Sequence, residues 1–154
     1  MALILKASII AAVMLILLVY CVYFPMIISY SVYEDPALQN WLIPWNIILY
    51  PTVLPILAAA VLAWLVVHSI GTDNCFTHKN AICLKWIGRL AFIDAAYFIT
   101  GNFILLFCNM NHPGIVVLST FLCLVGGVLG VTFAALAHLT EKAAVLQDDT
   151  DLTI

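Results

Sequence analysis

The sequence predicts an all-α membrane protein, a bundle of four helices that each cross the bilayer. Of the 154 residues, 66% are hydrophobic and 8% are charged, whereas soluble domains contain about a quarter charged residues. Four apolar runs, at 7–29, 46–70, 84–108 and 114–137, are long enough to cross a hydrocarbon core of about 30 Å. Backbone groups in lipid must be hydrogen-bonded within their own segment, so these runs should be helices. We expect a single domain over 1–154.

The first run, 7–29, resembles a secretory signal because Lys6 precedes it. We expect a retained span instead, since the run exceeds the usual apolar core of about 7 to 15 residues and no small-residue cleavage pattern follows. Lys and Arg occur only at positions 6, 79, 85, 89 and 142, before the first span, between the second and third, and after the fourth. Because cytoplasmic segments carry the excess of positive charge, both termini are predicted to be cytoplasmic.

The segment 31–45 should form the first outer connection. It contains no Lys or Arg, and its aromatic residues suit the headgroup region of a bilayer. Pro36 and Pro44 make a long regular helix there unexpected. Pro51 and Pro55 follow at the start of the second span, where each removes a backbone donor, so this helix should begin irregularly. A packing kink is the simpler meaning, and a gate or ligand site is the alternative.

The stretch NCFTHKNAICLKWIGRLAFID, residues 74–94, contains the predicted start of the third helix. Thr77 is a suitable N-cap and Phe76 supplies the apolar residue of a hydrophobic staple, so the helix should begin near His78. At 3.6 residues per turn, His78, Lys85 and Arg89 share one face. With Lys79 they form a basic surface that either anchors the span near anionic headgroups or docks an acidic segment of another protein.

Asp94 is the only acidic residue in the third span. A charged side chain within the bilayer is costly and usually faces other helices and a partner, so we expect it to face inward. The candidate partners are Tyr97, one turn further on, and His68 near the end of the second span. Two roles remain open: a neutral aspartate that hydrogen-bonds two helices together, and a site that handles protons or cations.

The fourth span carries small residues at a spacing of four, namely Gly126, Gly130 and Ala134. Such a ridge allows two helix backbones to approach closely. It predicts tight packing inside the protein or, alternatively, a homo-oligomer.

Beyond His138 the sequence becomes polar, and 139–154 is predicted to be a cytoplasmic, helical and acidic tail. Leu139, Ala143 and Leu146 lie one or two turns apart, so the fourth helix should continue about two turns past the membrane with an apolar stripe.

Motifs of enzymes and cofactor proteins are absent from the sequence. We find no glycine-rich phosphate loop, no HExxH and no GxSxG. The five cysteines form no CxxC pair, and Cys75, His78 and Cys83 match no standard zinc spacing. We therefore predict a protein that is not an enzyme, with no cofactor, no metal and no direct contact with nucleic acid.

Two segments carry a resemblance to a known family. NCFTHKNAICLKWIG is similar to a stretch that reads roughly N-P-F-T-x-E-N-A-x-x-L-K-x-I-G in the YoaS-like bacterial membrane proteins, the family of domain of unknown function 2975. The ending EKAAVLQDDTDLTI is similar to that family's E-K-A-x-x-L-Q-x-E-N-D-L-T-I. The chain departs from the pattern with Cys75 in place of proline, and with His78 and Lys79 in place of a more acidic pair.

The resemblance implies a four-span protein of the bacterial cell membrane with no known reaction. It also implies a gene neighbourhood that often holds a small Cro/C1-type helix-turn-helix regulator. The leading hypothesis is therefore a sensor or membrane partner that binds such a regulator through 71–89 and the tail, with Lys79, Lys85, Arg89 and Leu146 at the surface. A small transporter centred on Asp94 is the second hypothesis. An accessory or immunity-type subunit that binds through the glycine ridge is the third.

Overall fold

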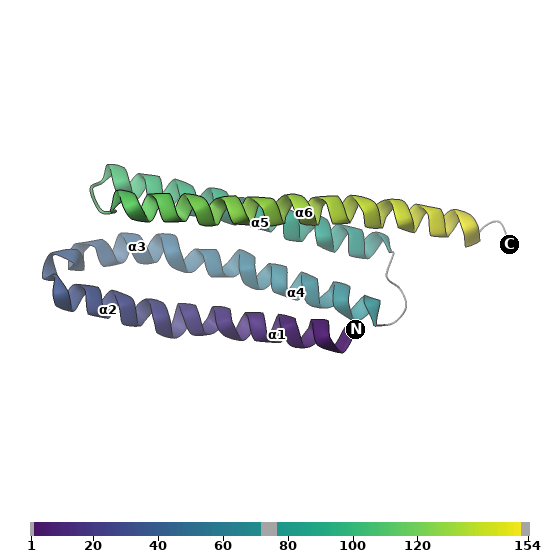
Figure 1. The fold of residues 1–154 in the computed structure, drawn as a ribbon, viewed down its shortest axis with the longest axis horizontal. Helices are drawn as coiled ribbons and strands as arrows, with labels where there is room; N and C mark the ends of the chain where they lie inside the picture. The colour runs from purple at the N-terminus through teal and green to yellow at the C-terminus, as the bar shows by residue number, and fades with distance from the viewer. Residues whose placement is uncertain (1, 72–76, 152–154) are drawn as a thin grey trace.

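The computed structural model describes residues 2–71 and 77–151, and these are helical almost throughout (Figure 1). Four helical segments are long and apolar enough to cross a membrane: Leu3–Glu34, Leu38–Ile70, His78–Phe107 and Pro113–Gln147. The predicted all-α fold with four spans is confirmed. Each segment extends past its apolar run because the flanking polar residues continue the helix.

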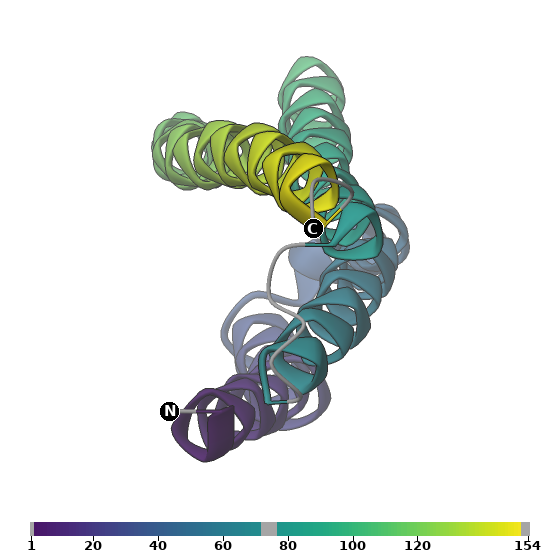
Figure 2. The ribbon, with the colours of Figure 1, turned by 90° about the vertical axis from the view of Figure 1, so that its right-hand side faces the viewer.

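The helices pack in the order in which they occur in the chain. α1 (Ala2–Leu18) lies against α4 (Val53–Ile70), α4 lies against α5 (His78–Phe107), and α5 packs along α6 (Pro113–Asp151). Seen from the end, they form an open arc and not a closed ring (Figure 2). The four-helix bundle of the prediction is therefore an open one.

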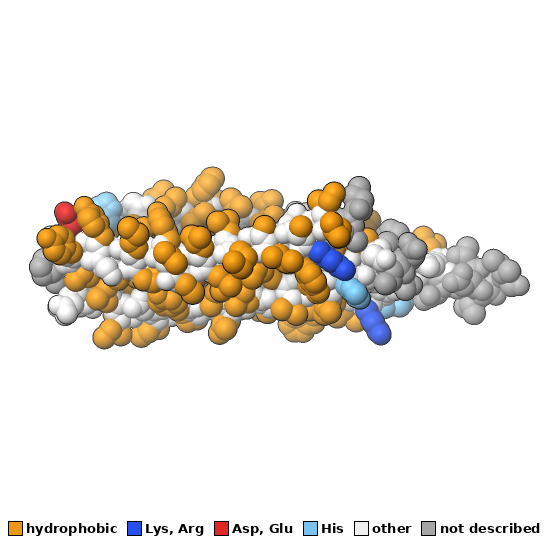
Figure 3. All heavy atoms as spheres, turned by 90° about the horizontal axis from the view of Figure 1, so that it is seen from below, with side chains coloured by type: hydrophobic (Ala, Val, Ile, Leu, Met, Phe, Trp, Pro, Cys, Tyr) orange, Lys and Arg blue, Asp and Glu red, His pale blue; other side chains and the backbone are white. Residues whose placement is uncertain are grey.

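The Lys and Arg residues lie toward one end of the molecule, which we call the basic end. The start of α1, the end of α4, the start of α5 and the end of α6 meet there (Figure 1). From below, hydrophobic side chains cover most of the length, with basic side chains toward one end and an acidic one at the other (Figure 3). This distribution is typical of a protein whose middle is surrounded by lipid.

The first connection is shorter than the predicted segment 31–45. α2 (Phe24–Glu34) continues the first span, a 3₁₀ turn covers Pro36–Trp41, and α3 (Leu42–Leu49) begins directly afterwards. The expectation of no long regular helix agrees with this segment, because α2 ends before Asp35, a six-residue 3₁₀ turn follows, and α3 has only eight residues. Both prolines occupy first turns. Backbone N–H groups in a first turn have no intrahelical acceptor, so proline removes no bond there.

A π-helical turn, Val19–Tyr23, separates α1 from α2 and was not predicted. The Phe24 N–H bonds to the Val19 carbonyl, five residues earlier. Pro25 follows and has no N–H for the carbonyl four residues before it. The widened turn lets the helix continue past Pro25. This proline is the feature of the sequence that could have indicated the π-helical turn.

The second span begins irregularly, as its prolines predicted. A 3₁₀ turn, Tyr50–Thr52, joins α3 to α4. Pro51 cannot donate to the carbonyl of Ile47, four residues earlier. The Tyr97 hydroxyl of α5 donates to this oxygen at 2.7 Å. A neighbouring helix therefore supplies the hydrogen bond that the proline removes.

Replacing Tyr97 with phenylalanine is expected to lower the free energy of unfolding by about 1 to 2 kcal/mol, because the Ile47 carbonyl loses its donor. SDS titration of the detergent-solubilised protein, followed by tryptophan fluorescence, measures this. Tyr30→Phe is the matched control, since Tyr30 is 65% exposed and has no hydrogen bond among the residues described. Equal unfolding midpoints for the two variants would contradict this role of Tyr97.

α5 and α6 pack along a seam of mostly small residues spaced seven apart. On α6 the buried positions include Val116, Gly130, Ala137 and Ala144, and on α5 they include Ala81, Gly88 and Asn102. A repeat of seven keeps one stripe facing the partner in a left-handed helix pair. Small side chains in the stripe bring the two backbones close together.

The predicted ridge of Gly126, Gly130 and Ala134 only partly coincides with this seam. Gly130 is buried, whereas the Ala134 side chain is exposed. A Cβ added to Gly126 would lie 3.9 Å from the Ala95 Cβ, an ordinary contact. The residues that face α5 along this long antiparallel contact are seven apart, whereas the predicted ridge residues are four apart. Residues spaced by four rotate gradually around the helix, so they do not all face α5.

Candidate functional site

A pocket of about 430 Å³ surrounds Asp94 near the middle of the helices. We call it the Asp94 pocket. All four spans line it, through residues 20 and 24 of the first, 49–59 of the second, 87–98 of the third and 122–133 of the fourth. Asp94 is its only charged lining residue, and four aromatic rings contribute to the wall: Tyr20, Phe24, Phe98 and Phe133. Asp94 faces the other helices, as expected from the cost of a charged side chain that faces lipid.

The carboxylate of Asp94 has no hydrogen-bond partner in the part of the chain that the structure describes. Its Oδ1 atom is buried without a donor. Neither expected partner reaches it: Tyr97 donates to the Ile47 carbonyl, and the Nδ1 atom of His68 lies 3.3 Å from the Lys6 Nζ atom. Pro51 explains the first difference, since it leaves that carbonyl free. His68 does not reach Asp94 because it lies near the end of α4, at the basic end, whereas Asp94 lies near the middle of α5. The hydrogen bond expected of a structural aspartate is therefore not present.

The other polar side chains of the pocket are already hydrogen-bonded, to each other or to backbone carbonyls. The Thr52 hydroxyl donates to the Leu49 carbonyl at 2.6 Å, so the Tyr20 hydroxyl, 2.5 Å from Thr52 Oγ1, must be the donor in that pair. Cys123 directs its Sγ toward the Ala95 carbonyl at 3.4 Å. These bonds leave Asp94 as the group that lacks a partner.

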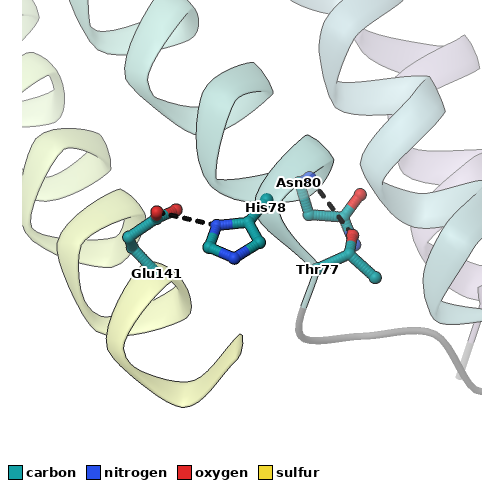
Figure 4. A network of polar contacts seen from close by, with 4 residues as sticks. All are labelled: Thr77, His78, Asn80 and Glu141. Carbon is teal, nitrogen blue, oxygen red and sulfur yellow. Dashed lines mark hydrogen bonds and ion pairs between the residues drawn. The ribbon is translucent and has the colours of Figure 1, made fainter. Parts of the chain in front are cut away.

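The start of α5 at the basic end is fixed by local hydrogen bonds (Figure 4). Thr77 occupies the N-cap position, where its Oγ1 accepts a hydrogen bond from the Asn80 backbone at 3.3 Å. The Asn80 side chain donates to the Ser69 hydroxyl of α4 at 3.0 Å. Phe76, the predicted staple residue, and Cys75, where the family pattern has proline, lie outside the described residues.

His78 joins α5 to α6. Its Nδ1 atom lies 2.7 Å from the Glu141 Oε1 atom, and both side chains are about half exposed (Figure 4). Thr77 and Asn80 belong to one segment that carries the family resemblance, and Glu141 belongs to the other. The two segments therefore meet at the basic end. An exposed pair of this kind contributes at most about 1 kcal/mol, so it aligns the helices more than it stabilises them.

The basic side chains expected at this end are exposed. Lys79 and Lys85 point to the surface, and the Arg89 guanidinium lies over the Trp86 ring at 5.2 Å. His78 is also half exposed, and it pairs with Glu141. Leu146 is 68% exposed on α6. No group of three metal-binding side chains occurs in the described ranges.

A buried amide network at the opposite end was not predicted. Asn102 is fully buried, and its Oδ1 accepts from Asn111 Nδ2 and Ser119 Oγ, each at 3.1 Å. Its own Nδ2 donates to the Phe98 carbonyl at 2.9 Å. The network holds α5, the turn and α6 together. The only sign of this network in the sequence is an amide side chain within an apolar run, and it does not indicate the partners.

Comparison with known proteins identifies a family but not a reaction. A model of the family "Protein of unknown function (DUF2975)" matches residues 26–154. Comparison with curated proteins and with solved structures gave no match. The matched range includes the seam, the Asp94 pocket wall from α4 to α6 and both segments at the basic end. The chain therefore belongs to the DUF2975 family of proteins of unknown function.

Proposed function

We propose that this chain is a non-enzymatic, multi-pass protein of the bacterial plasma membrane whose basic end faces the cytoplasm and binds a small Cro/C1-type helix-turn-helix regulator. The observation that carries the proposal is the exposed apolar surface on the last part of α6. Leu139, Val145 and Leu146 are 62%, 46% and 68% exposed. These side chains follow the predicted span 114–137, and exposed apolar side chains beyond the membrane mark a surface for a protein partner.

The position of this surface follows from the contact between His78 and Glu141. His78 is the first residue of α5, so α6 continues past the start of α5 from Lys142 to Asp151 (Figure 1). At about 1.5 Å per residue, this extension is roughly 15 Å long. Val145 and Leu146 lie on it, beyond the end of the neighbouring helix.

The charges at this end fit the same proposal. Lys79, Lys85 and Arg89 are exposed on the part of α5 toward the basic end, and the positive charge there favours a cytoplasmic location for this end. Their positive charge would also favour a partner with an acidic surface, because complementary charge raises the rate of association.

Replacing Leu146 with aspartate should reduce recovery of the regulator at least tenfold, because burying a leucine side chain contributes about 1.5 to 3 kcal/mol. The measurement is co-purification of the regulator from the same gene neighbourhood with tagged, detergent-solubilised protein. Arg89→Glu should reduce recovery as well. Tyr33→Asp is the matched control, since Tyr33 is 85% exposed at the opposite end. Unchanged recovery with both Leu146→Asp and Arg89→Glu would refute the proposal.

The two alternatives are affected differently by the geometry. A proton-handling site at Asp94 is consistent with the absence of a hydrogen bond to its buried oxygen. The expected neighbours Tyr97 and His68, however, contact other groups. An accessory subunit or homo-oligomer built on the glycine ridge competes with the seam, where Gly130 already packs against α5. Both alternatives therefore have less support than the docking surface.

A further inference from the structure

The Asp94 pocket contains a carboxyl group with no hydrogen-bond donor and no positively charged side chain beside it among the described residues. Asp94 lies near the middle of α5, and its Oδ1 atom is buried without a hydrogen bond from any described residue. The lining contains no lysine, arginine or histidine. A carboxylate at this depth needs a positive charge or a proton. Since no described lining residue carries a positive charge, the carboxylate is either protonated or paired with a cation that a ligand brings.

The rest of the lining indicates which kind of cation would fit. Apart from Asp94, the wall is apolar or aromatic, with the rings of Tyr20, Phe24, Phe98 and Phe133. Aromatic faces attract cations, most strongly where water is excluded. A volume of about 430 Å³ lies within the range of small-molecule sites, about 300 to 1,000 Å³.

An inorganic cation fits this pocket poorly. Hard metal ions require several oxygen ligands, about six for Mg²⁺ and six to eight for Ca²⁺. The hydroxyls of Tyr20 and Thr52 are bonded to each other and to the Leu49 carbonyl. Asp94 alone cannot replace a hydration shell. A cation that has apolar substituents needs no such shell, because its surface is already compatible with the wall.

We propose that the Asp94 pocket binds a lipophilic organic cation, a single positive charge carried on apolar or aromatic substituents, with Asp94 as its counter-ion and the four rings as its wall. The carboxylate supplies the charge, and the rings supply apolar and cation–π contact. This proposal is independent of the docking surface, which lies at the basic end.

The test uses tetraphenylphosphonium and tetraphenylborate, two ions of nearly the same size and shape with opposite charge. Binding is measured by equilibrium dialysis of the purified full chain in a non-ionic detergent, with empty micelles subtracted. The protein should bind the phosphonium and not the borate. Equal binding of the two ions, or no binding of the phosphonium, would overturn the proposal.

Variants identify the residue responsible. Asp94→Asn should weaken phosphonium binding at least tenfold, whereas Glu34→Gln, which removes one negative charge at the exposed opposite end, should leave it unchanged. Phe98→Leu keeps an apolar wall but removes one ring, and should weaken binding several-fold. If Asp94→Asn is not recovered as a folded protein, the comparison of the two ions and the Phe98→Leu variant still decide. Unchanged phosphonium binding in a folded Asp94→Asn protein would place the ligand elsewhere and refute the assignment.

Discussion

Replacing Gly88 with alanine is expected to lower the free energy of unfolding by about 1 to 3 kcal/mol, the usual cost of overfilling a packed site. The added methyl carbon would lie 2.9 Å from the Gly130 carbonyl oxygen and 3.4 Å from the Ala134 nitrogen. Both atoms belong to the backbone of α6 and cannot rotate away. α5 and α6 must therefore separate along their seam. SDS titration followed by tryptophan fluorescence would show unfolding at a lower detergent fraction.

Gly127→Ala is the matched control for this prediction. A Cβ at Gly127 meets no atom within 4 Å, and alanine favours a helix over glycine by roughly 0.5 to 1 kcal/mol. This variant should be as stable as the original protein or more stable. Gly130→Ala should fall between the two, because its new atom would meet the Phe92 ring at 2.9 Å, and that ring is 45% exposed and free to turn. The same unfolding midpoint for all three variants would show that close approach does not hold this helix pair together.

Replacing Asn102 with leucine is expected to lower the free energy of unfolding by about 2 to 4 kcal/mol. The leucine side chain has a similar size, so the main loss is the Oδ1 acceptor. Ser119 would lose the acceptor of its hydroxyl, and Asn111 Nδ2 would keep only its longer bond to the Asn102 backbone carbonyl at 3.3 Å. A buried donor without an acceptor costs about 1 to 3 kcal/mol. The same SDS titration measures the change.

A second substitution separates the network from simple packing. In the Asn102→Leu background, Ser119→Ala should restore part of the lost stability, because it removes a hydroxyl that no longer has its acceptor. Thr132→Val is the control, since the Thr132 hydroxyl donates only within α6, to the Val128 carbonyl at 2.8 Å. An additive loss in the double variant would mean that Asn102 contributes through packing alone.

The number and approximate limits of the spans could be predicted because lipid imposes a simple rule on composition. Every span must be apolar over about 20 residues, and each of the four runs satisfies this. The start of α5 could also be predicted, because a cap depends only on neighbouring residues, here Thr77 and Asn80. Local chemistry and overall hydrophobicity are both readable from one sequence.

Contacts between helices could not be predicted to the same degree. In a soluble helix, polarity separates the buried face from the exposed one, but here the lipid-facing side chains are as apolar as the buried ones. Leu105 is 2% exposed and Ile104 is 55% exposed, although both are aliphatic and adjacent in the sequence. Polarity therefore cannot tell which small residues form the seam.

The partners of buried polar residues were unpredictable for a related reason. Tyr97 was expected to reach Asp94, one turn away on the same helix, but it donates to Ile47 on another span. A spacing rule within one helix cannot reveal a backbone acceptor that a proline has freed elsewhere. Asn102 was overlooked because a lone amide in an apolar run gives no sign of its partners across the turn.

α6 is one continuous helix that joins the Asp94 pocket to the exposed extension. It runs without a break from Pro113 to Asp151, with Gly126 in the wall of the Asp94 pocket and Leu146 on the exposed extension. These two residues are separated by about 30 Å along the axis. A tilt of about 5° pivoting at the pocket would therefore swing the tip sideways by about 2.6 Å, from simple leverage over that length. Because no break interrupts the helix between these two residues, a tilt at the pocket would be carried to the exposed extension.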